Sequence, residues 1–339
     1  MKSIKKLLVI RLSALGDICM TLPVIDSFCR AYPDVQVTFL TSKPGAAIIN
    51  AVLRLDNLIV HPINKKDYSG LFGANKLYNE MKELRFDAVA DLHDVLRTKW
   101  VDLRFRLSGC PVKVIDKGRD EKKELTSHSY NKQLKSGILR YKEVFEALGF
   151  EFDVDYEGSQ HRIKNDVKIP AIGIAPFAQH KGKIYPPELM KEVVDKLINE
   201  TEDLSIYLFG GPDDAAILQS WTEACPERII NVAGKQTFAD DLALMSGLQL
   251  MISMDSANMH LASLVGLRCL SIWGATHIHA GFLGYHQSED DVIDLELPCR
   301  PCSIYGNKAC KYGDYRCLAK ITPDTIVKRV KTAIQAQNS

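Results

Sequence analysis

The sequence has no run of apolar residues long enough to cross a membrane. A spanning helix needs about 18 or more apolar residues with few or no charges, and no stretch of the 339 residues reaches that length. The basic start, MKSIKK, followed by apolar residues is compatible with a secretory signal. However, Arg11 and Asp17 interrupt the apolar run where such a signal should be unbroken. We therefore expect a cytoplasmic protein that is at most peripheral on a membrane.

The sequence also has almost no excess of charge of either sign, and it lacks the common nucleotide-binding motifs. It has 43 Lys and Arg against 42 Asp and Glu, a formal net charge of +1, so no nucleic-acid partner is expected. No G-x-G-x-x-G stands at the first strand of either half, and no G-x-x-x-x-G-K-[ST] occurs. These absences argue against a nicotinamide dehydrogenase and a P-loop enzyme. We expect no cofactor.

The nine cysteines form no evident disulfide framework. An odd number in a long chain without a signal favours reduced thiols. Four of them, Cys299, Cys302, Cys310 and Cys317, crowd into one short region and could supply four thiolates to a tetrahedral zinc ion. Reduced thiols also pack as small hydrophobes, and the segment between Cys302 and Cys310 is shorter than in most zinc ribbons. We expect a structural role without a catalytic metal, with zinc binding as the open alternative.

The length and the apolar pattern predict two α/β domains. KKLLVIR, VQVTFLTS, DAVADLH and VKVID are typical of buried parallel strands with helical segments between them. A polar stretch at 157–170 suits a linker, after which AIGIAPF, SIYLFGG, RIINVAG, LQLMISM and RCLSIWG repeat the pattern. We predict two doubly wound sheets, in domains 1–160 and 168–320, and a C-terminal helix in 321–339 that begins after Thr322. Ligands of such sheets bind at the carboxyl ends of the strands, so the site is expected in the cleft between the domains.

Two of the expected loops carry residues suited to chemistry. Asp17 follows the first strand, so it is either a helix cap or a carboxylate that takes a proton from a substrate hydroxyl. In MDSANMHLA, Asp255 ends a strand and Ser256 opens a helix whose N-terminal amides favour an anion. His260 shares a helical face with Ser256, and is either a structural residue or part of the site.

Two further loops offer weaker signals. His180, Lys181 and Lys183 in APFAQHKGKIYPPELM place positive charge beside the start of a helix, either for an anionic leaving group or as a solvated loop. LFGGPDD supplies a glycine pair and two acids after another strand, which is compatible with any tight turn.

Together these loops resemble those of a known family. The matching pieces are VIRLSALGDICMTLPVI, DLHDVLRTK, HKGKIYPPE, LFGGPDD and SMDSANMHLASLVGLRCLSIWGATH, and the likeness runs over nearly the whole chain. The sequence resembles glycosyltransferase family 9, whose best-known members are ADP-heptose:lipopolysaccharide heptosyltransferases. The resemblance implies a GT-B architecture, two Rossmann-like domains facing a cleft, and inverting transfer of a heptose or related sugar from an ADP-sugar to a lipopolysaccharide core acceptor. The alternatives are another nucleotide-sugar donor, or a nucleotide-sugar-binding protein without turnover.

The resemblance also implies roles for particular residues. Asp17 matches the general base, in an acceptor-binding first domain, and Lys183 matches a phosphate-binding lysine in a K-x-W-P pattern that here reads KIYP. The second domain would bind the nucleotide. Its loop usually reads D-T-G-x-x-H and corresponds here to Asp255, Ser256, Ala257 and His260. Ser keeps the hydroxyl and Ala keeps the amide, so diphosphate binding is expected, whereas Ala restricts close approach and leaves the donor sugar open.

Weaker placements complete the expected site. The acids Asp213 and Asp214 would meet the ribose, and Gln236 and Thr237 would border the base. No D-x-D motif accompanies the nucleotide loops, so cationic side chains and helix amides rather than a metal ion are expected to stabilise departing ADP. For the acceptor, Arg97, Lys99, Arg119 and Lys122 form a basic set suited to a phosphorylated or lipid-linked sugar at the inner membrane surface. The alternative is that they are ordinary solvated charges.

Overall fold

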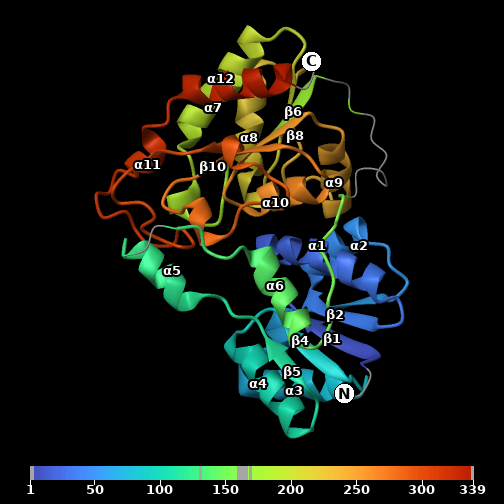
Figure 1. Cartoon of the computed structure of the whole chain (residues 1–339). Coiled ribbons are helices and arrows are strands. Elements are labelled where there is room, and N and C mark those ends of the chain that lie inside the picture. Colours follow the sequence, from blue (N-terminus) through green and yellow to red (C-terminus); the bar gives the residue numbers. More distant parts are fainter. Residues whose placement is uncertain (1–3, 130–131, 159–166, 168–169, 337–339) are drawn as a thin grey trace. The chain divides into compact units, whose positions relative to one another are not determined.

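The computed structural model describes residues 4–129, 132–158, 167 and 170–336. The chain forms two compact units, each built on its own parallel sheet (Figure 1). The first unit comprises Met1–Lys117 and Lys135–Glu157, and the second comprises Gly118–Leu134 and Gly158–Ser339. The sequence predicts a single boundary near residue 160. The chain instead also passes into the second unit earlier, because residues 118–134 belong to that unit. The expected linker at 157–170 lies largely outside the described residues.

The first unit is a five-stranded sheet in the order β3-β2-β1-β4-β5, with every pairing parallel. Its strands are β1 (Lys6–Ile10), β2 (Gln36–Ser42), β3 (Leu58–Ile63), β4 (Ala88–Asp91) and β5 (Val112–Val114). Its helices are α1 (Leu15–Ala31), α2 (Lys43–Val52), α3 (Gly70–Lys82), α4 (Leu96–Leu107) and α6 (Gly137–Glu146). The strand order reverses between β1 and β4, which is where ligands of open α/β sheets bind.

Burial on both faces explains why the first strand is parallel and central. Leu7, Leu8, Val9 and Ile10 are all fully buried, as expected for a strand covered by helices on both sides. On one of these sides α1 packs against α6, where the rings of Phe28 and Phe145 lie 4.7 Å apart. This aromatic contact holds α6 against the last turn of α1.

The second unit is a six-stranded sheet in the order β11-β10-β9-β6-β7-β8, again with parallel pairings. Its strands are β6 (Ala171–Ala175), β7 (Ser205–Leu208), β8 (Ile229–Asn231), β9 (Leu250–Met254), β10 (Cys269–Ile272) and β11 (Val292–Ile293). Its helices are α5 (Arg119–Thr126), α7 (Pro187–Glu200), α8 (Ala215–Trp221), α9 (Phe238–Ser246), α10 (Ala257–Leu264), α11 (Arg316–Ala319) and α12 (Pro323–Gln335). Here the order reverses between β6 and β9.

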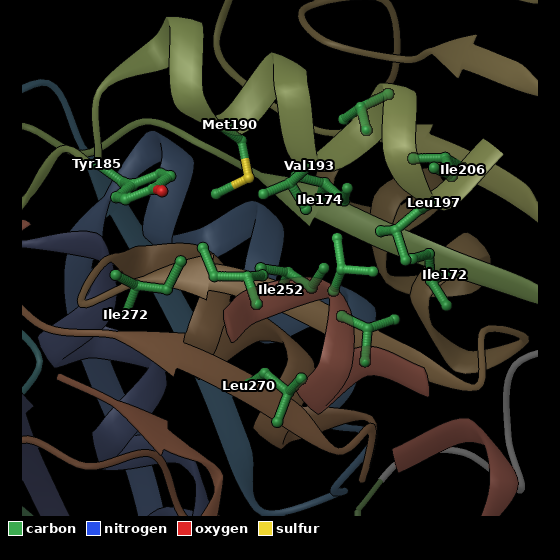
Figure 2. Close-up of a cluster of buried hydrophobic side chains, with 14 of the residues drawn as sticks. Ile172, Ile174, Tyr185, Met190, Val193, Leu197, Ile206, Ile252, Leu270 and Ile272 are labelled. Atoms are coloured by element: carbon green, nitrogen blue, oxygen red, sulfur yellow. The ribbon is translucent and has the colours of Figure 1, made fainter. Parts of the chain in front are cut away.

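The core of the second unit lies between the sheet and the helices α7 and α12. Ile174 of β6 and Ile252 of β9 pack with Val193 and Leu197 of α7 (Figure 2). Tyr185 is fully buried beside them, and its hydroxyl donates to the Ile321 carbonyl at 2.7 Å. The chain just before Tyr185, which carries Lys183, is thereby anchored to the core.

The predicted fold class is confirmed: two doubly wound parallel sheets and a C-terminal helix. The Thr322 hydroxyl caps α12 by accepting from the Thr325 amide at 3.3 Å, as the Thr-Pro signal predicts. The predicted strand at 87–93 ends earlier, at Asp91, because the side chain of Asp91 accepts from the backbone of the following turn. Among the described residues, none of the helices combines the length and the apolar character that crossing a membrane requires.

Candidate active site

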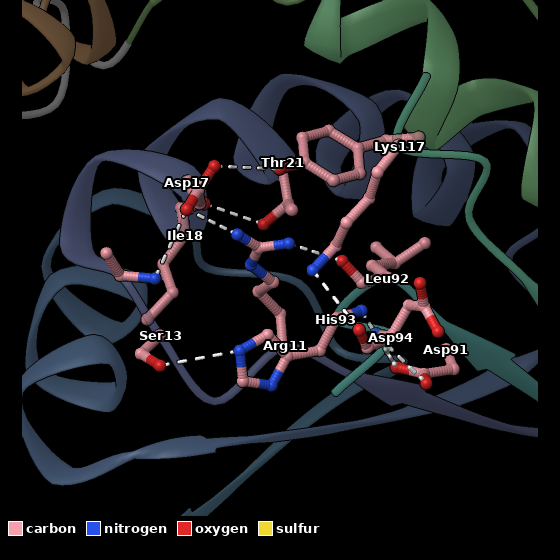
Figure 3. A network of polar contacts seen from close by, with 12 residues as sticks. Arg11, Ser13, Asp17, Ile18, Thr21, Asp91, Leu92, His93, Asp94 and Lys117 are labelled. Atoms are coloured by element: carbon pink, nitrogen blue, oxygen red, sulfur yellow. Dashed lines mark hydrogen bonds and ion pairs between the residues drawn. The ribbon is translucent and has the colours of Figure 1, made fainter. Parts of the chain in front are cut away.

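In the first unit, Asp17 lies in the first turn of α1, after the central strand. Its Oδ2 forms an ion pair with Arg11, whose side chain is almost completely buried, and accepts from the Ala14 amide at 3.3 Å (Figure 3). The Asp17 side chain is 32% exposed. The two expected roles are therefore compatible, because the carboxylate caps the helix with one oxygen and is still accessible to solvent.

Neighbouring elements hold this carboxylate from two sides. The Tyr141 hydroxyl of α6 lies 3.5 Å from Asp17 Oδ1, and the Tyr141 ring lies 5.7 Å from the Arg11 guanidinium carbon. Arg11 also donates to the Leu92 carbonyl, in the loop after β4, at 2.5 Å. The guanidinium thus ties the loop after β1 to the loop after β4, across the point where the strand order reverses.

The loop after β4 adds a second buried polar group. Asp91 accepts from the His93 amide at 2.8 Å, and His93 Nε2 lies 3.4 Å from the Ser13 hydroxyl (Figure 3). Burial, and then the charges of Arg11 and Lys117, lower the pKa of His93 to about 3. At neutral pH this imidazole is uncharged, so it contributes a neutral polar group beside Ser13 and not a positive charge.

In the second unit, Lys183 and Asp255 meet at the corresponding reversal of strand order. Lys183 comes from the loop after β6 and Asp255 directly follows β9, and their Nζ and Oδ2 atoms lie 2.8 Å apart. Both side chains are largely buried. The ammonium is therefore held in one place by an ion pair at the carboxyl edge of the sheet, where an anionic ligand would bind.

The cysteine-rich segment, residues 299–317, packs against the side chain of Lys183. Gly306 has φ +73°, and a Cβ added to it would lie 2.6 Å from Lys183 Cγ, so only glycine fits beneath the lysine stem. The Gly306 carbonyl also accepts from the Gly182 amide at 3.3 Å. Arg300 anchors the start of the segment, donating to the carbonyls of Gly274 at 2.5 Å and Thr276 at 3.1 Å. This segment thus forms one side of the Lys183 site.

The predicted nucleotide loop opens α10. The Ser256 hydroxyl accepts from the Asn258 amide at 3.3 Å and lies 3.1 Å from the Ser253 hydroxyl. Ala257 is the first helical residue, and His260 is buried in the next turn. Asp255 directly precedes Ser256, the N-cap of α10, and it pairs with Lys183. The Lys183 ammonium is thereby tied to the loop that begins α10.

The weaker nucleotide candidates lie further along the same edge. Asp213 is exposed in the short turn after β7, and Gln236 and Thr237 are exposed after β8. Thr237 caps α9, because its hydroxyl accepts from the Asp240 amide at 3.3 Å and donates to the Asp240 carboxylate at 2.7 Å. Asp213, Gln236 and Thr237 follow β7 and β8, so they lie at the same edge of the sheet but further from Lys183, which follows β6. Thr237 has a structural role as the N-cap of α9.

The four basic residues predicted for the acceptor belong to both units. Arg97 and Lys99 are on α4 of the first unit, where Lys99 lies 3.4 Å from Asp94. Arg119 and Lys122 are on α5 of the second unit. Lys122 is buried, with its ammonium 4.4 Å from the Phe282 ring centroid, so it packs within its unit and is not a solvated charge.

The four clustered cysteines are free thiols. Within the described part of the chain, no three His, Cys, Asp or Glu side chains are grouped so that they could hold a metal ion. Cys317 is buried in the core of the second unit, and burial raises the pKa of its thiol to about 11. Packing of this thiol supports the structural interpretation of the segment.

Two parallel α/β units, each with polar residues at its reversal of strand order, match the architecture of GT-B glycosyltransferases. Residues 75–312 match the model of glycosyltransferase family 9 (heptosyltransferase), and the chain belongs to this family. It is 23% identical to the lipopolysaccharide core heptosyltransferase OpsX of Haemophilus influenzae, over 79% of each chain.

Solved structures share the fold over almost the full length. The family 9 glycosyltransferase of Veillonella parvula superposes with a TM-score of 0.73 at 19% identity, covering 99% of both chains. The Escherichia coli heptosyltransferase WaaC, solved with ADP, gives a TM-score of 0.68 at 15% identity, covering 97% of this chain and 98% of that one. These likenesses confirm the predicted GT-B fold, and the match of residues 75–312 to the family model confirms the predicted family.

Sequence reasoning missed four residues of the site. Arg11 and His93 have the signal that could have found them, since each is a polar residue at or just after the end of a buried strand. Tyr141 and Gly306 have no such signal, because only the packing of α6 and of the cysteine-rich segment brings them to Asp17 and Lys183.

Proposed function

We propose that this protein is an inverting glycosyltransferase that moves a heptose from an ADP-heptose donor to a lipopolysaccharide core acceptor. Family membership and relatives named as lipopolysaccharide heptosyltransferases support the reaction. The observation that carries the assignment to residues is the pair of polar clusters at the two reversals of strand order, Arg11–Asp17 in one unit and Lys183–Asp255 in the other.

In the proposed mechanism Asp17 is the general base. Its carboxylate takes the proton of the acceptor hydroxyl while that oxygen attacks the anomeric carbon of the donor sugar from the face opposite the diphosphate. Its Oδ2 is engaged by Arg11 and the Ala14 amide, and its Oδ1 accepts from the Tyr141 hydroxyl at 3.5 Å. Arg11 and Tyr141 orient the carboxylate.

The second unit handles the leaving group. As the bond between the anomeric carbon and the phosphate oxygen breaks, its electron pair passes to the diphosphate of ADP. Lys183 and the Ala257 amide at the start of α10 meet this charge. His260, Asp213, Gln236 and Thr237 are proposed to line the remainder of the nucleotide site.

We further propose that the acceptor is a lipid-linked or phosphorylated sugar at the inner membrane surface, with Arg97, Lys99 and Arg119 as its cationic contacts. Lys122, being buried, is the least suited of the four to touch it directly.

The test is release of ADP from ADP-heptose in the presence of a deacylated, heptose-free lipopolysaccharide core, compared with ADP-hexoses, UDP-sugars and GDP-sugars. We expect turnover with ADP-heptose to exceed that with the other donors by about tenfold or more, the scale on which enzymes discriminate by a few group contacts. Preferred turnover with another donor would indicate a different family 9 transferase. Tight ADP binding without turnover of any donor would indicate a binding protein.

A further inference from the structure

The helices α3 and α4 of the first unit present large apolar side chains to solvent. Phe72 is 95% exposed and Leu96 is 88% exposed, and Leu71, Leu103 and Leu107 are also exposed. The helices α3 and α4 pack side by side (Figure 1), and we call the surface that carries these exposed residues the α3–α4 face. Scattered exposed leucines are ordinary, but a contiguous apolar surface marks an interaction site.

A groove runs between the two helices on this face. Its volume is about 570 Å³, and it is lined by Leu71, Ala74, Leu96, Trp100 and Leu103, with Arg97 and Lys99 among the remaining lining residues. Trp100 contributes a buried indole N–H for which the described residues provide no hydrogen-bond acceptor. The groove therefore combines an apolar lining with an unused donor, which suits the ester region of a lipid.

The charge on the same face is positive. α4 carries Arg97, Lys99, Arg104 and Arg106, while its single acid, Asp102, is buried and faces the interior. Lys99 has a partner in Asp94, and Arg104 donates to Asn75 at 3.0 Å and lies over the Tyr78 ring. Apolar residues and Trp flanked by Arg and Lys are the composition of protein surfaces that lie in the interface of an anionic bilayer.

We propose that the α3–α4 face docks on the surface of a bilayer that contains anionic phospholipids. Phe72 and Leu96 enter the interface, the basic side chains of α4 meet the phosphates, and the groove receives part of one lipid chain. A second copy of the chain is a poorer occupant, because a twofold contact through this face would bring the cations of α4 against their own copies. The biological purpose rests on the proposed lipid-linked acceptor, whereas the docking itself does not.

The experiment is flotation of the full-length protein with vesicles of phosphatidylethanolamine and phosphatidylglycerol (3:1), and with vesicles of phosphatidylcholine alone. We expect binding to the anionic vesicles that weakens at high salt, and little binding to phosphatidylcholine. The double variant Phe72→Ser/Leu96→Ser should lose about tenfold or more in vesicle affinity, since it removes two apolar side chains from the interface. The matched control is Leu139→Ser/Ile217→Ser, which changes two exposed apolar residues elsewhere in the chain and should bind as the wild type does.

Three outcomes would overturn the proposal. They are no vesicle binding by the wild type, equal loss in the control variant, and sedimentation equilibrium in which the wild type dimerises and Phe72→Ser/Leu96→Ser does not. Turnover of the deacylated acceptor is measured in parallel and should be unchanged in the double variant. Loss of vesicle binding with normal turnover supports docking, whereas absence of turnover in the wild type bears on the proposed reaction alone.

Discussion

At the scale of single residues, the candidate functional residues form two ion pairs, one within each unit. Asp17 and Arg11 make one pair, and Lys183 and Asp255 make the other. In the first pair the sequence predicts only Asp17 as functional and Arg11 holds it, whereas in the second pair both Lys183 and Asp255 are predicted. Substituting a functional member therefore changes both chemistry and stability, and the two effects must be measured separately.

Asp17→Asn should lower turnover by about 100-fold or more, which is the usual scale for loss of a general base. The asparagine oxygen can still accept from the Ala14 amide, so the cap persists, while the buried Arg11 loses its ionised partner. We expect ADP affinity to be unchanged. Turnover is measured below the unfolding temperature of the variant, and near-normal turnover would reduce Asp17 to a helix cap.

Lys183→Ala should weaken ADP binding by about tenfold or more, since a hydrogen bond to a charged group contributes about 1.5–3 kcal/mol. His260→Ala is expected to weaken ADP binding as well. The matched control is Lys181→Ala, because Lys181 lies in the same loop but has its ammonium over the Tyr315 ring, 5.3 Å away. Calorimetric titration with ADP measures all three. Equal affinities for Lys183→Ala and Lys181→Ala would place the diphosphate elsewhere.

At the scale of elements, the strands and helices were largely predictable, and the support of the site was not. Apolar runs and helical spacing predict β1, α7 and α12, because the periodicity of apolar residues within each of these segments is enough to indicate a strand or a helix. The contact of Gly306 with Lys183 joins segments far apart in the chain, and no local pattern encodes it. The sequence thus predicts Lys183 and leaves out the segment that positions it.

Two glycines of the cysteine-rich segment allow that support to be tested. Gly306→Ala and Gly313→Ala both place alanine at a positive φ, +73° and +76°, so each should cost about 1 kcal/mol of stability. Only at Gly306 does the added methyl group meet the Lys183 side chain. We expect Gly306→Ala alone to weaken ADP binding, by calorimetry. A similar affinity in both variants would show that the segment does not position Lys183.

The junction of β4 and α4 should make stability depend on pH. Burial, and then the charge of Asp91, raise the pKa of Asp102 to about 9, against about 4 in an unfolded chain. The folded protein therefore holds a proton that the unfolded chain releases between these values, and stability falls as pH rises towards 9. The slope is at most about 1.4 kcal/mol per pH unit for one proton.

Asp102→Asn mimics the protonated form and should flatten this slope. Urea unfolding at pH 6, 7, 8 and 9 measures it, with Asp203→Asn, an exposed carboxyl elsewhere, as the control. We expect the free energy of unfolding of Asp102→Asn to exceed that of the wild type at pH 9. Parallel pH profiles for the wild type and Asp102→Asn would show that Asp102 ionises normally.

At the scale of the whole molecule, we expect the two units to have different roles, with the general base in the first and the nucleotide site in the second. If the second unit holds the nucleotide, ADP should slow amide hydrogen exchange in peptides that cover residues 176–186 and 254–264. Peptides of β1 and α1 should be unaffected by ADP alone. Mass spectrometry of the exchanged protein measures this, and protection confined to residues 7–25 would reverse the proposed roles of the units.

The path of the chain between the units limits how the protein can be taken apart. It passes from one unit to the other at residues 117–118, 134–135 and 157–158. A fragment that starts at residue 158 would lack Leu125 and Leu134, which pack with Ala280 and Phe282 of the second unit. Exchanging donor specificity with a relative therefore requires transplanting two separate stretches, and a single fusion point near the polar stretch at 157–170 would leave an apolar surface of the second unit uncovered.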